Sequence, residues 1–281
     1  MVTENGVSFG WIPAPPEKQN LHAALYGFQV FLPFVAAEAV NVVLPRDPKF
    51  AAWFDQDKMN ACVAASTAKT MAMSNLSQVG AQQYNWREHY RWACANDNDP
   101  QTSYERDVGT YLWAGMDCLR KVGAYIVNRG FDIEHGLDRY FWITGANAVD
   151  QGRTAIANGQ PTVVGMPWPE SGFNPIWDEK IKMYRFPGRS TWKKFPGGHA
   201  IAWIGALDKY NGFVMSNSWA GAGYPDEVLI DYSDAQYLMT NLGAEWVVGV
   251  DRNFVPPPPP AKHTVSAVLV IDGISYPLKE V

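Results

Sequence analysis

Four residues of this chain have the types and the order that hydrolysis of an amide bond through a thiol requires. Gln56 precedes Cys62, and His199 and Asn217 follow far downstream in that order. A thiolate can attack an amide carbonyl, and a histidine can hold the proton and then deliver it to the leaving amine. An asparagine oxygen can fix the plane and the tautomer of that histidine. Each residue alone would be an ordinary structural one, but together they predict a nucleophilic active site.

The segment that begins at Cys62 is expected to favour the thiolate. Residues 61–75 are rich in alanine and methionine and contain no glycine or proline, which predicts a helix with Asn60 as its N-cap. The first turn of a helix carries partial positive charge and stabilises an anion there. We therefore expect a reactive Cys62, with its backbone N–H and the side-chain amide of Gln56 as donors to the oxyanion.

The segment around His199 is expected to position the base. Gly197 and Gly198 allow a close approach of backbone beside it. Asn217 would accept a hydrogen bond from the imidazole, and Trp219 would shield that bond from water and so strengthen it. The predicted catalytic residues are Cys62, His199, Asn217 and Gln56, with Trp219 and Gly198 as residues that bind substrate or shield the site. We expect neither a metal ion nor a cofactor.

These motifs resemble those of the papain family of cysteine peptidases, in particular its bacterial and viral members. The resemblance extends over roughly residues 9–250 and is carried by Asp55-Gln56 with Cys62-Val63-Ala64, by Ala155–Met166, by Gly197–Gly205 and by Phe213–Trp219. His199 lies within the window of roughly 130–150 residues after the cysteine that is typical of this family, and Asn217 lies just past it. The resemblance implies an endopeptidase that cleaves peptides or proteins through a thioester acyl-enzyme.

The chain departs from the family pattern at positions that shape substrate binding. Val63 replaces the usual aromatic residue after the nucleophile, Ala220 replaces a usual glycine, and the stretch 220–224 also differs. The resemblance therefore leaves substrate preference open. Only residues 1–61 precede Cys62, which leaves no room for a long inhibitory propeptide. We expect either no zymogen or a short arm, within residues 1–46, that covers the cleft.

The elements expected along the chain place helices before strands. A second helix is predicted over Tyr104–Asn128, where apolar residues recur at steps of three and four. Thr102 and Glu105 have the spacing of a capping box at its start, and Gly130 lies just past its end. Apolar segments punctuated by Gly, Pro, Asn and Asp predict strands at Thr162–Met166, His199–Ala206, Phe213–Ser218, Val228–Tyr232 and Trp246–Val250.

This order of elements indicates an α+β fold. The resemblance implies its papain-like two-lobed form, with an N-terminal helical lobe, a C-terminal antiparallel β-sheet or barrel lobe, and the active site in the cleft between them. Residues 1–255 are expected to form this domain, 256–260 a polyproline linker, and 261–281 a tail with a β-hairpin that turns at Asp272-Gly273. The apolar segment 28–43 fits either a strand or a buried helix.

Composition narrows the classes of partner. The chain has 23 basic and 28 acidic residues and a net charge of −5, which argues against nucleic acid as the main partner. No apolar run is long enough to span a bilayer, and the N-terminus lacks the shape of a secretory signal. We expect a cytoplasmic protein, or one that enters a particle or is secreted by another route. The three cysteines are expected to stay reduced.

Two other functions stay open. The fold could serve as a structural or maturation component of a larger assembly such as a phage particle, bound through residues 256–281, with activity optional. An isolated hairpin is marginal in water, which motivates a docking surface for that tail. A cell-wall amidase could use the same cysteine–histidine chemistry, but such domains usually hold nucleophile and base closer together in sequence, so this function is disfavoured.

Overall fold

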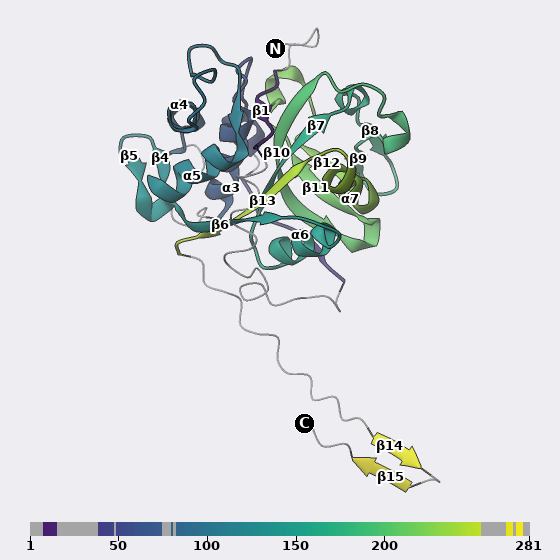
Figure 1. The fold of residues 1–281 in the computed structure, drawn as a ribbon. Helices are drawn as coiled ribbons and strands as arrows, with labels where there is room; N and C mark the ends of the chain where they lie inside the picture. Colours follow the sequence, from purple (N-terminus) through teal and green to yellow (C-terminus); the bar gives the residue numbers. More distant parts are fainter. Residues whose placement is uncertain are drawn as a thin grey trace.

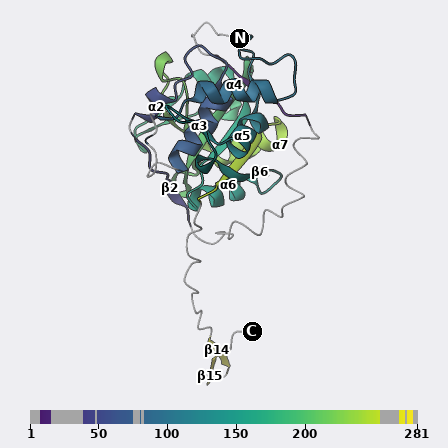
Figure 2. The same ribbon diagram turned by 90° about the vertical axis from the view of Figure 1, so that its left-hand side faces the viewer.

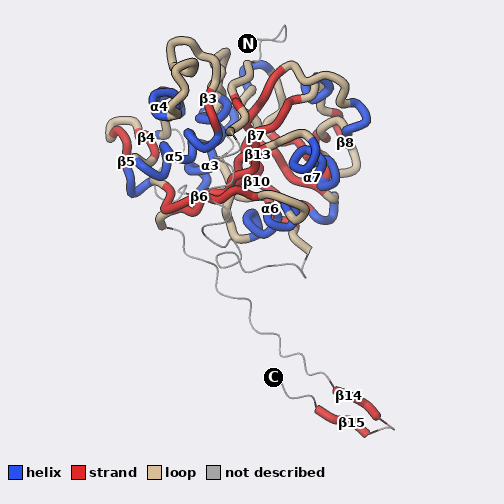
Figure 3. Tube along the Cα trace, viewed as in Figure 1, coloured by secondary structure: helices blue, strands red, loops and turns tan. Residues whose placement is uncertain are grey.

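The computed structural model places a group of helices beside a large β-sheet (Figure 1). It describes residues 8–15, 39–47, 49–74, 80, 83–253, 268–271 and 274–277. Seen from the helical side, α3, α4 and α5 lie together in front of the sheet (Figure 2). Helices and strands are distinguished in Figure 3, and the architecture is α+β, as predicted.

The sheet has nine strands in the order β6-β13-β7-β10-β11-β12-β9-β8, with β2 paired to β10 off this path. Its pairs are antiparallel except β12 with β9. The strands are β2 (Asn41–Val43), β6 (Leu137–Ile143), β7 (Thr162–Trp168), β8 (Ile176–Asp178), β9 (Met183–Arg185), β10 (Gly197–Leu207), β11 (Gly212–Ser216), β12 (Glu227–Asp231) and β13 (Glu245–Asp251). All five predicted strands are present within this set.

Strand β10 is the centre of the molecule. It pairs with β7, β11 and β2, and it contacts the helices α3 (Cys62–Ser74) and α6 (Ala148–Ala157). A strand covered in this way has almost no polar side, which explains why the residues from His199 to Leu207 are all buried and mostly apolar. The strand therefore holds His199 on a rigid support.

Helix α3 matches the helix predicted over residues 61–75. Every residue from Cys62 to Met73 is buried, because its alanines let neighbouring helices approach closely. The predicted N-cap is displaced: the carbonyl of Ala61 accepts the first helical hydrogen bond, and the side-chain amide of Asn60 donates to the carbonyl of Asp107. The helix therefore begins at Cys62 itself.

The single helix predicted over Tyr104–Asn128 is wrong in its length. Only α5 (Leu112–Lys121) is helical within that range, between β3 (Thr110–Tyr111) and β4 (Ala124–Ile126). Gly123 has a φ of +85°, and a Cβ there would lie 1.9 Å from the carbonyl oxygen of Asp132. A left-handed glycine ends a helix, so the chain turns into β4 at this point.

The predicted start of that helix fails for a different reason. The hydroxyl of Thr102 donates to the carboxylate of Asp97, so the predicted capping box does not form there. Gly109 has a φ of +102°, and its Cβ position would collide with the backbone of Gly10. The close passage of a distant segment thus shapes the chain before α5, and no local pattern indicates it.

The remaining elements support this frame. Helix α4 begins after Asn85, whose side chain accepts a hydrogen bond from the N–H of Arg87. The other elements are α2 (Phe50–Trp53), α4 (Trp86–Asn96), β5 (Gly130–Asp132), which pairs with β4, and α7 (Tyr232–Asn241). Among the described helices, none is both long and apolar enough to cross a membrane.

Two short pairings involve the predicted arm and the predicted tail. Strand β1 (Trp11–Ile12) runs parallel to β3, and β14 (Val268–Ile271) pairs antiparallel with β15 (Ile274–Pro277). The second pair is the predicted hairpin, while its turn at 272–273 lies outside the described residues. So do the proposed linker 256–260 and most of the ambiguous segment 28–43, of which residues 41–43 form β2.

Candidate active site

Cys62 lies at the first position of α3, against the strand that carries His199. The backbone N–H of Ala200 donates to Cys62 Sγ at 3.3 Å. One turn further along α3, the hydroxyl of Ser66 donates to the carbonyl of Ala200 at 2.9 Å. The helix is therefore hydrogen-bonded to both backbone groups of Ala200, which fixes the sulfur next to the residue that follows His199.

His199 forms the hydrogen bond to Asn217 that the sequence predicts, at 2.8 Å between Nε2 and Oδ1. The same Oδ1 accepts a hydrogen bond from the N–H of Ser218 at 2.7 Å, so this atom acts as an acceptor. It follows that Nε2 of His199 carries the proton and that Nδ1 holds a free lone pair. Among the described residues, Nδ1 has no hydrogen-bond partner.

Aromatic rings enclose the histidine. Trp219 stacks on His199 with centroids 3.9 Å apart and an interplanar angle of 24°. Trp168, at the end of β7, meets the same imidazole edge-on at 5.0 Å. Two aromatic rings thus pack against the imidazole that is bonded to Asn217.

Gln56 is buried next to the Asn217 segment. Its backbone N–H donates to the carbonyl of Ser218 at 2.9 Å, and its Oε1 accepts from the Ser218 hydroxyl at 2.6 Å. Its Nε2 donates to the carbonyls of Met59 at 2.8 Å and Ser8 at 3.1 Å. The amide group that the sequence assigns to the oxyanion is thus directed at a carbonyl from the N-terminal segment.

The N-terminal segment 8–14 lies over the site. Its tightest passage is at Gly10, where a Cβ would fall 1.7 Å from the carbonyl oxygen of Asn60. Phe9 packs edge-on against Trp219 at 6.0 Å. The indole N–H of Trp11 donates to Glu245 Oε2 at 3.0 Å. The segment is therefore held by aromatic packing, by a buried carboxylate and by its pairing with β3.

The glycines before His199 make room for this segment. A Cβ on Gly197 would lie 2.5 Å from the ring of Phe9, and one on Gly198 would lie 2.5 Å from the ring of Trp11. As a result of the cover, Cys62 and His199 are both 0% exposed. Gly198 thus contacts the segment that lies in the cleft in this structure.

Burial sets the protonation state of the pair. Loss of water raises the pKa of Cys62 to about 12, although hydrogen bonds from the backbone of Ala200 and Gly10 offset part of this. Burial also lowers the pKa of His199 to about 3, against the hydrogen bond to Asn217. The thiol and the imidazole are therefore both neutral in this form. The expected thiolate is not the form present here, because desolvation outweighs the helix terminus.

Lys69 is a buried residue of the site that the sequence interpretation missed. Its Nζ donates to the carbonyl of Asn217 at 2.6 Å and to the hydroxyl of Ser216 at 3.1 Å. The signal in the sequence was a single charged side chain within Cys62–Ser74, a helix otherwise built from small and apolar residues. A charge on such a helix requires a partner, and here the partners are Ser216 and Asn217, the second of which is bonded to His199.

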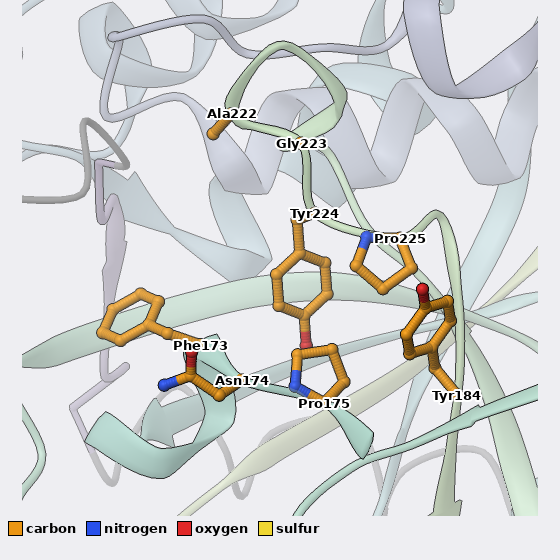
Figure 4. A pocket seen from close by; sticks show the side chains of 8 residues that line it. All are labelled: Phe173, Asn174, Pro175, Tyr184, Ala222, Gly223, Tyr224 and Pro225. Atoms are coloured by element: carbon orange, nitrogen blue, oxygen red, sulfur yellow. The ribbon is translucent and has the colours of Figure 1, made fainter. Parts of the chain in front are cut away.

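An open pocket of about 550 Å³ adjoins the covered site (Figure 4). Phe173 and Asn174 lie on one side of it and Tyr184 and Pro225 on the other, with Pro175, Ala222, Gly223 and Tyr224 completing the lining. Phe173 also stacks on Trp219 at 5.8 Å, and Tyr224 meets the same indole edge-on at 5.6 Å. The pocket therefore shares a wall with the ring that covers His199.

The described residues include no cluster of three or more His, Cys, Asp or Glu side chains that could hold a metal ion. Cys62, Cys94 and Cys118 are buried and free, as predicted.

Comparison with solved structures identifies the fold. The sequence matches no protein-family model and no curated protein. The structure is similar to xylellain, a cysteine protease from Xylella fastidiosa, with a TM-score of 0.60 and 18% identity over 88% of this chain and 97% of that chain.

The structure of this chain is also similar to those of two proenzymes. For digestive procathepsin L 3 of Tenebrio molitor the TM-score is 0.53, with 11% identity over 78% of this chain and 73% of that one. For procathepsin B S9 of Trypanosoma congolense it is 0.50, with 12% identity over 86% of each chain. The chain therefore has the papain-like two-lobed fold predicted from its motifs.

Proposed function

We propose that this protein is a cysteine-type endopeptidase that hydrolyses peptide bonds through Cys62, His199, Asn217 and Gln56. The observation that carries the proposal is the tautomer of His199. Asn217 accepts from Nε2, which leaves the Nδ1 lone pair free in the residue next to Ala200, whose N–H touches the Cys62 sulfur. The structures similar to this one are themselves described as cysteine proteases.

The chemistry follows from these positions. His199 Nδ1 takes the proton of Cys62, and the thiolate attacks the peptide carbonyl to form a C–S bond. Gln56 Nε2 and the backbone N–H of Cys62 donate to the oxyanion. The C–N bond then breaks as the imidazolium gives its proton to the leaving amine. Water, deprotonated by His199, attacks the thioester and releases the acid and the thiol.

In the form described here the site is covered, so the cover must be displaced before catalysis. Phe9, Gly10 and Trp11 occupy the space beside Cys62 and His199, and the Ser8 carbonyl takes the amide of Gln56. Residues 8–14 then act as a short inhibitory arm. Displacement of this arm would rehydrate the pair and allow the thiolate and imidazolium to form.

The pocket beside Trp219 is suited to a side chain of the substrate. Phe173, which touches both Phe9 of the arm and Trp219, forms its near wall. A peptide that replaces the arm would place a side chain on this side of the nucleophile. Aromatic and proline walls favour an apolar or aromatic residue there.

Labelling with an epoxysuccinyl inhibitor of papain-like enzymes tests the proposal. We expect one adduct by intact mass, mapped to Cys62, and no adduct in His199→Ala. Cys94 and Cys118 are buried thiols on other elements and serve as internal controls. Equal labelling of all three cysteines, or labelling that survives His199→Ala, would contradict an assembled catalytic pair.

A role in an assembly is a second proposal, compatible with the first. Strands β14 and β15 form a two-stranded sheet of their own, and such a hairpin is marginal in water without a surface to dock on. Deletion of residues 256–281 should then remove a partner that co-purifies with the full chain. A monomer that behaves identically with and without these residues would contradict this role.

A further inference from the structure

Lys69 is buried at the junction between the nucleophile helix and the catalytic asparagine. Its side chain is 1% exposed, and its Nζ lies 3.7 Å from Asp226 Oδ1 as well as in hydrogen-bond contact with the carbonyl of Asn217 and the hydroxyl of Ser216. The Ser216 hydroxyl in turn donates to Asp226 Oδ1 at 2.7 Å. Lys69, Ser216 and Asp226 therefore form a closed network of contacts next to the main chain of Asn217, the partner of His199.

Stability alone does not account for a lysine at this position. Burial of an ammonium group is costly, and replacement of a buried ion pair by an apolar side chain of similar size is often neutral or favourable. The same helix accommodates Met71 and Met73 within the core. Asp226 also pairs with Arg46, so it would keep one cationic partner without Lys69.

The spacing along α3 relates Lys69 to the nucleophile. Cys62, Ser66 and Lys69 lie at positions i, i+4 and i+7 and so share one face of the helix. Along this face the sulfur accepts from the N–H of Ala200, Ser66 donates to the carbonyl of Ala200, and Lys69 donates to the carbonyl of Asn217. One rigid helix thus sets the positions of the nucleophile, the base strand and the asparagine.

We propose that Lys69 is a positioning residue, which holds the main chain at Asn217 so that its side-chain oxygen faces Nε2 of His199. This inference rests on the proposed peptidase function and adds a residue to its machinery. Asn217 is otherwise held at its N–H by the carbonyl of Asp226 and at Oδ1 by the N–H of Ser218. The Lys69 contact holds its carbonyl, the third point at which the residue is fixed.

The charge of Lys69 also acts on the base. Burial lowers the pKa of Lys69 to about 8. The positive charge of Arg46 also lowers this pKa, whereas the negative charges of Asp226 and Asp55 raise it. Below pH 8 the ammonium is charged, and this charge contributes to the lowered pKa of His199. Removal of the charge should therefore raise the pKa of His199.

A double-mutant cycle tests the positioning role. Lys69→Met keeps the length of the side chain and removes the donor and the charge. We expect kcat toward a peptide substrate to fall roughly tenfold to a hundredfold, because small displacements of catalytic groups have such effects. KM should stay within about twofold. In the Asn217→Ala background the same change should have little further effect, because the group being positioned is absent.

Thr67→Val is the matched control. Thr67 is buried on the same helix, but its hydroxyl donates to the carbonyls of Val63 and Ala64 within α3. Its loss should leave kcat and the His199 titration unchanged. Lys69→Gln, which keeps an uncharged donor, should recover part of the lost kcat. If Lys69→Met instead unfolds the protein, the Lys69→Gln and Thr67→Val pair decides the question by the same readouts.

A readout independent of activity separates this inference from the proposed function. The Nε2 proton of His199 is buried and hydrogen-bonded, so it should give a slowly exchanging NMR resonance in the full chain. We expect that resonance to be lost or to exchange faster in Lys69→Met and to persist in Thr67→Val. Persistence in Lys69→Met with normal kcat, or losses that simply multiply in the double mutant, would overturn the inference. If the wild-type protein cleaves no peptide, the proposed peptidase function is refuted instead. The NMR resonance would still decide the role of Lys69.

Discussion

The proposed catalytic groups and the adjoining pocket differ in their access to solvent. Cys62 and His199 are 0% exposed beneath residues 8–14, whereas the pocket lined by Phe173, Tyr184 and Tyr224 is open. Trp219 lies between the two regions and contacts both. Under the proposed function, chemistry and recognition are controlled separately: the arm suppresses the thiolate by excluding water, while the pocket beside it is already open to substrate.

The largest change within this comparison should come from Gln56, whose amide donates to the arm here and, in the proposed mechanism, to the oxyanion. Gln56→Ala should lower kcat by roughly 10²- to 10³-fold, because one preorganised donor to the oxyanion is lost. KM should change little, since the substrate carbonyl is bound more weakly than the oxyanion. Steady-state kinetics on a peptide substrate measure both. A variant with raised KM and normal kcat would assign Gln56 to binding of the arm or substrate alone.

Displacement of residues 8–14 should open Cys62 and His199 to solvent, as the pocket already is. In Gly10→Ala the new Cβ would meet the carbonyl of Asn60 at 1.7 Å, so the covered state is destabilised. Such overpacking typically costs about 1–3 kcal/mol, which corresponds to a roughly tenfold to hundredfold faster labelling of Cys62.

A matched control exists for this substitution. A Cβ on Gly188 would make only an ordinary contact, 3.7 Å from Asp234 Oδ2, so Gly188→Ala should label like wild type. Equal labelling rates in Gly10→Ala and Gly188→Ala would show that the segment 8–14 does not control access to the thiol.

The dependence of stability on pH should also report the cover. The pKa of His199 is lowered to about 3 in the folded chain, below the usual value of an exposed histidine. As pH falls from about 6.5 toward 3, the unfolded chain binds a proton that the folded chain does not. Stability should therefore decrease by up to about 1.4 kcal/mol per pH unit from this group. Urea unfolding at pH 7 and pH 5 measures the difference.

His89 provides the comparison for that experiment. His89 lies on α4, and burial lowers its pKa to about 3 as well. Its Nε2 accepts a hydrogen bond from the N–H of Tyr125, which is not part of the arm. His199→Gln and His89→Gln should each reduce the loss of stability at pH 5. Introduction of Gly10→Ala should weaken the contribution of His199 and leave that of His89 unchanged. An equal effect on both would argue against a local cover.

The smallest effect is expected at the open pocket. Tyr184→Ala removes one aromatic wall and should raise KM for substrates with an aromatic residue on the pocket side by roughly twofold to tenfold. The labelling rate of Cys62 should not change, because Tyr184 is remote from the arm contacts. Comparison of aromatic and alanine-containing peptides measures the preference. A uniform change for both peptides would remove the pocket from substrate recognition.

Residue types and local periodicity were enough to predict much of this molecule. The Ala-rich segment after Asn60 predicted α3, because such a segment forms a helix and packs closely in any setting. Five strands were predicted because their apolar runs are bounded by turn residues. The apolar spacing over 104–128 misled, since Gly123 and Gly109 adopt left-handed conformations imposed by contacts with Asp132 and Gly10.

Within the site, the sequence by itself determined which groups could do chemistry: a thiol, an imidazole and two amides in one order. The single charge at Lys69 was also visible in the sequence, but no role was predicted for it. Only the tertiary structure decided which atoms meet and which state they take. The partner of Lys69, the tautomer of His199 and the cover by residues 8–14 all depend on contacts between segments far apart in the chain. The physical reason is that a pKa depends on how completely water is excluded, and this is a property of the packed molecule.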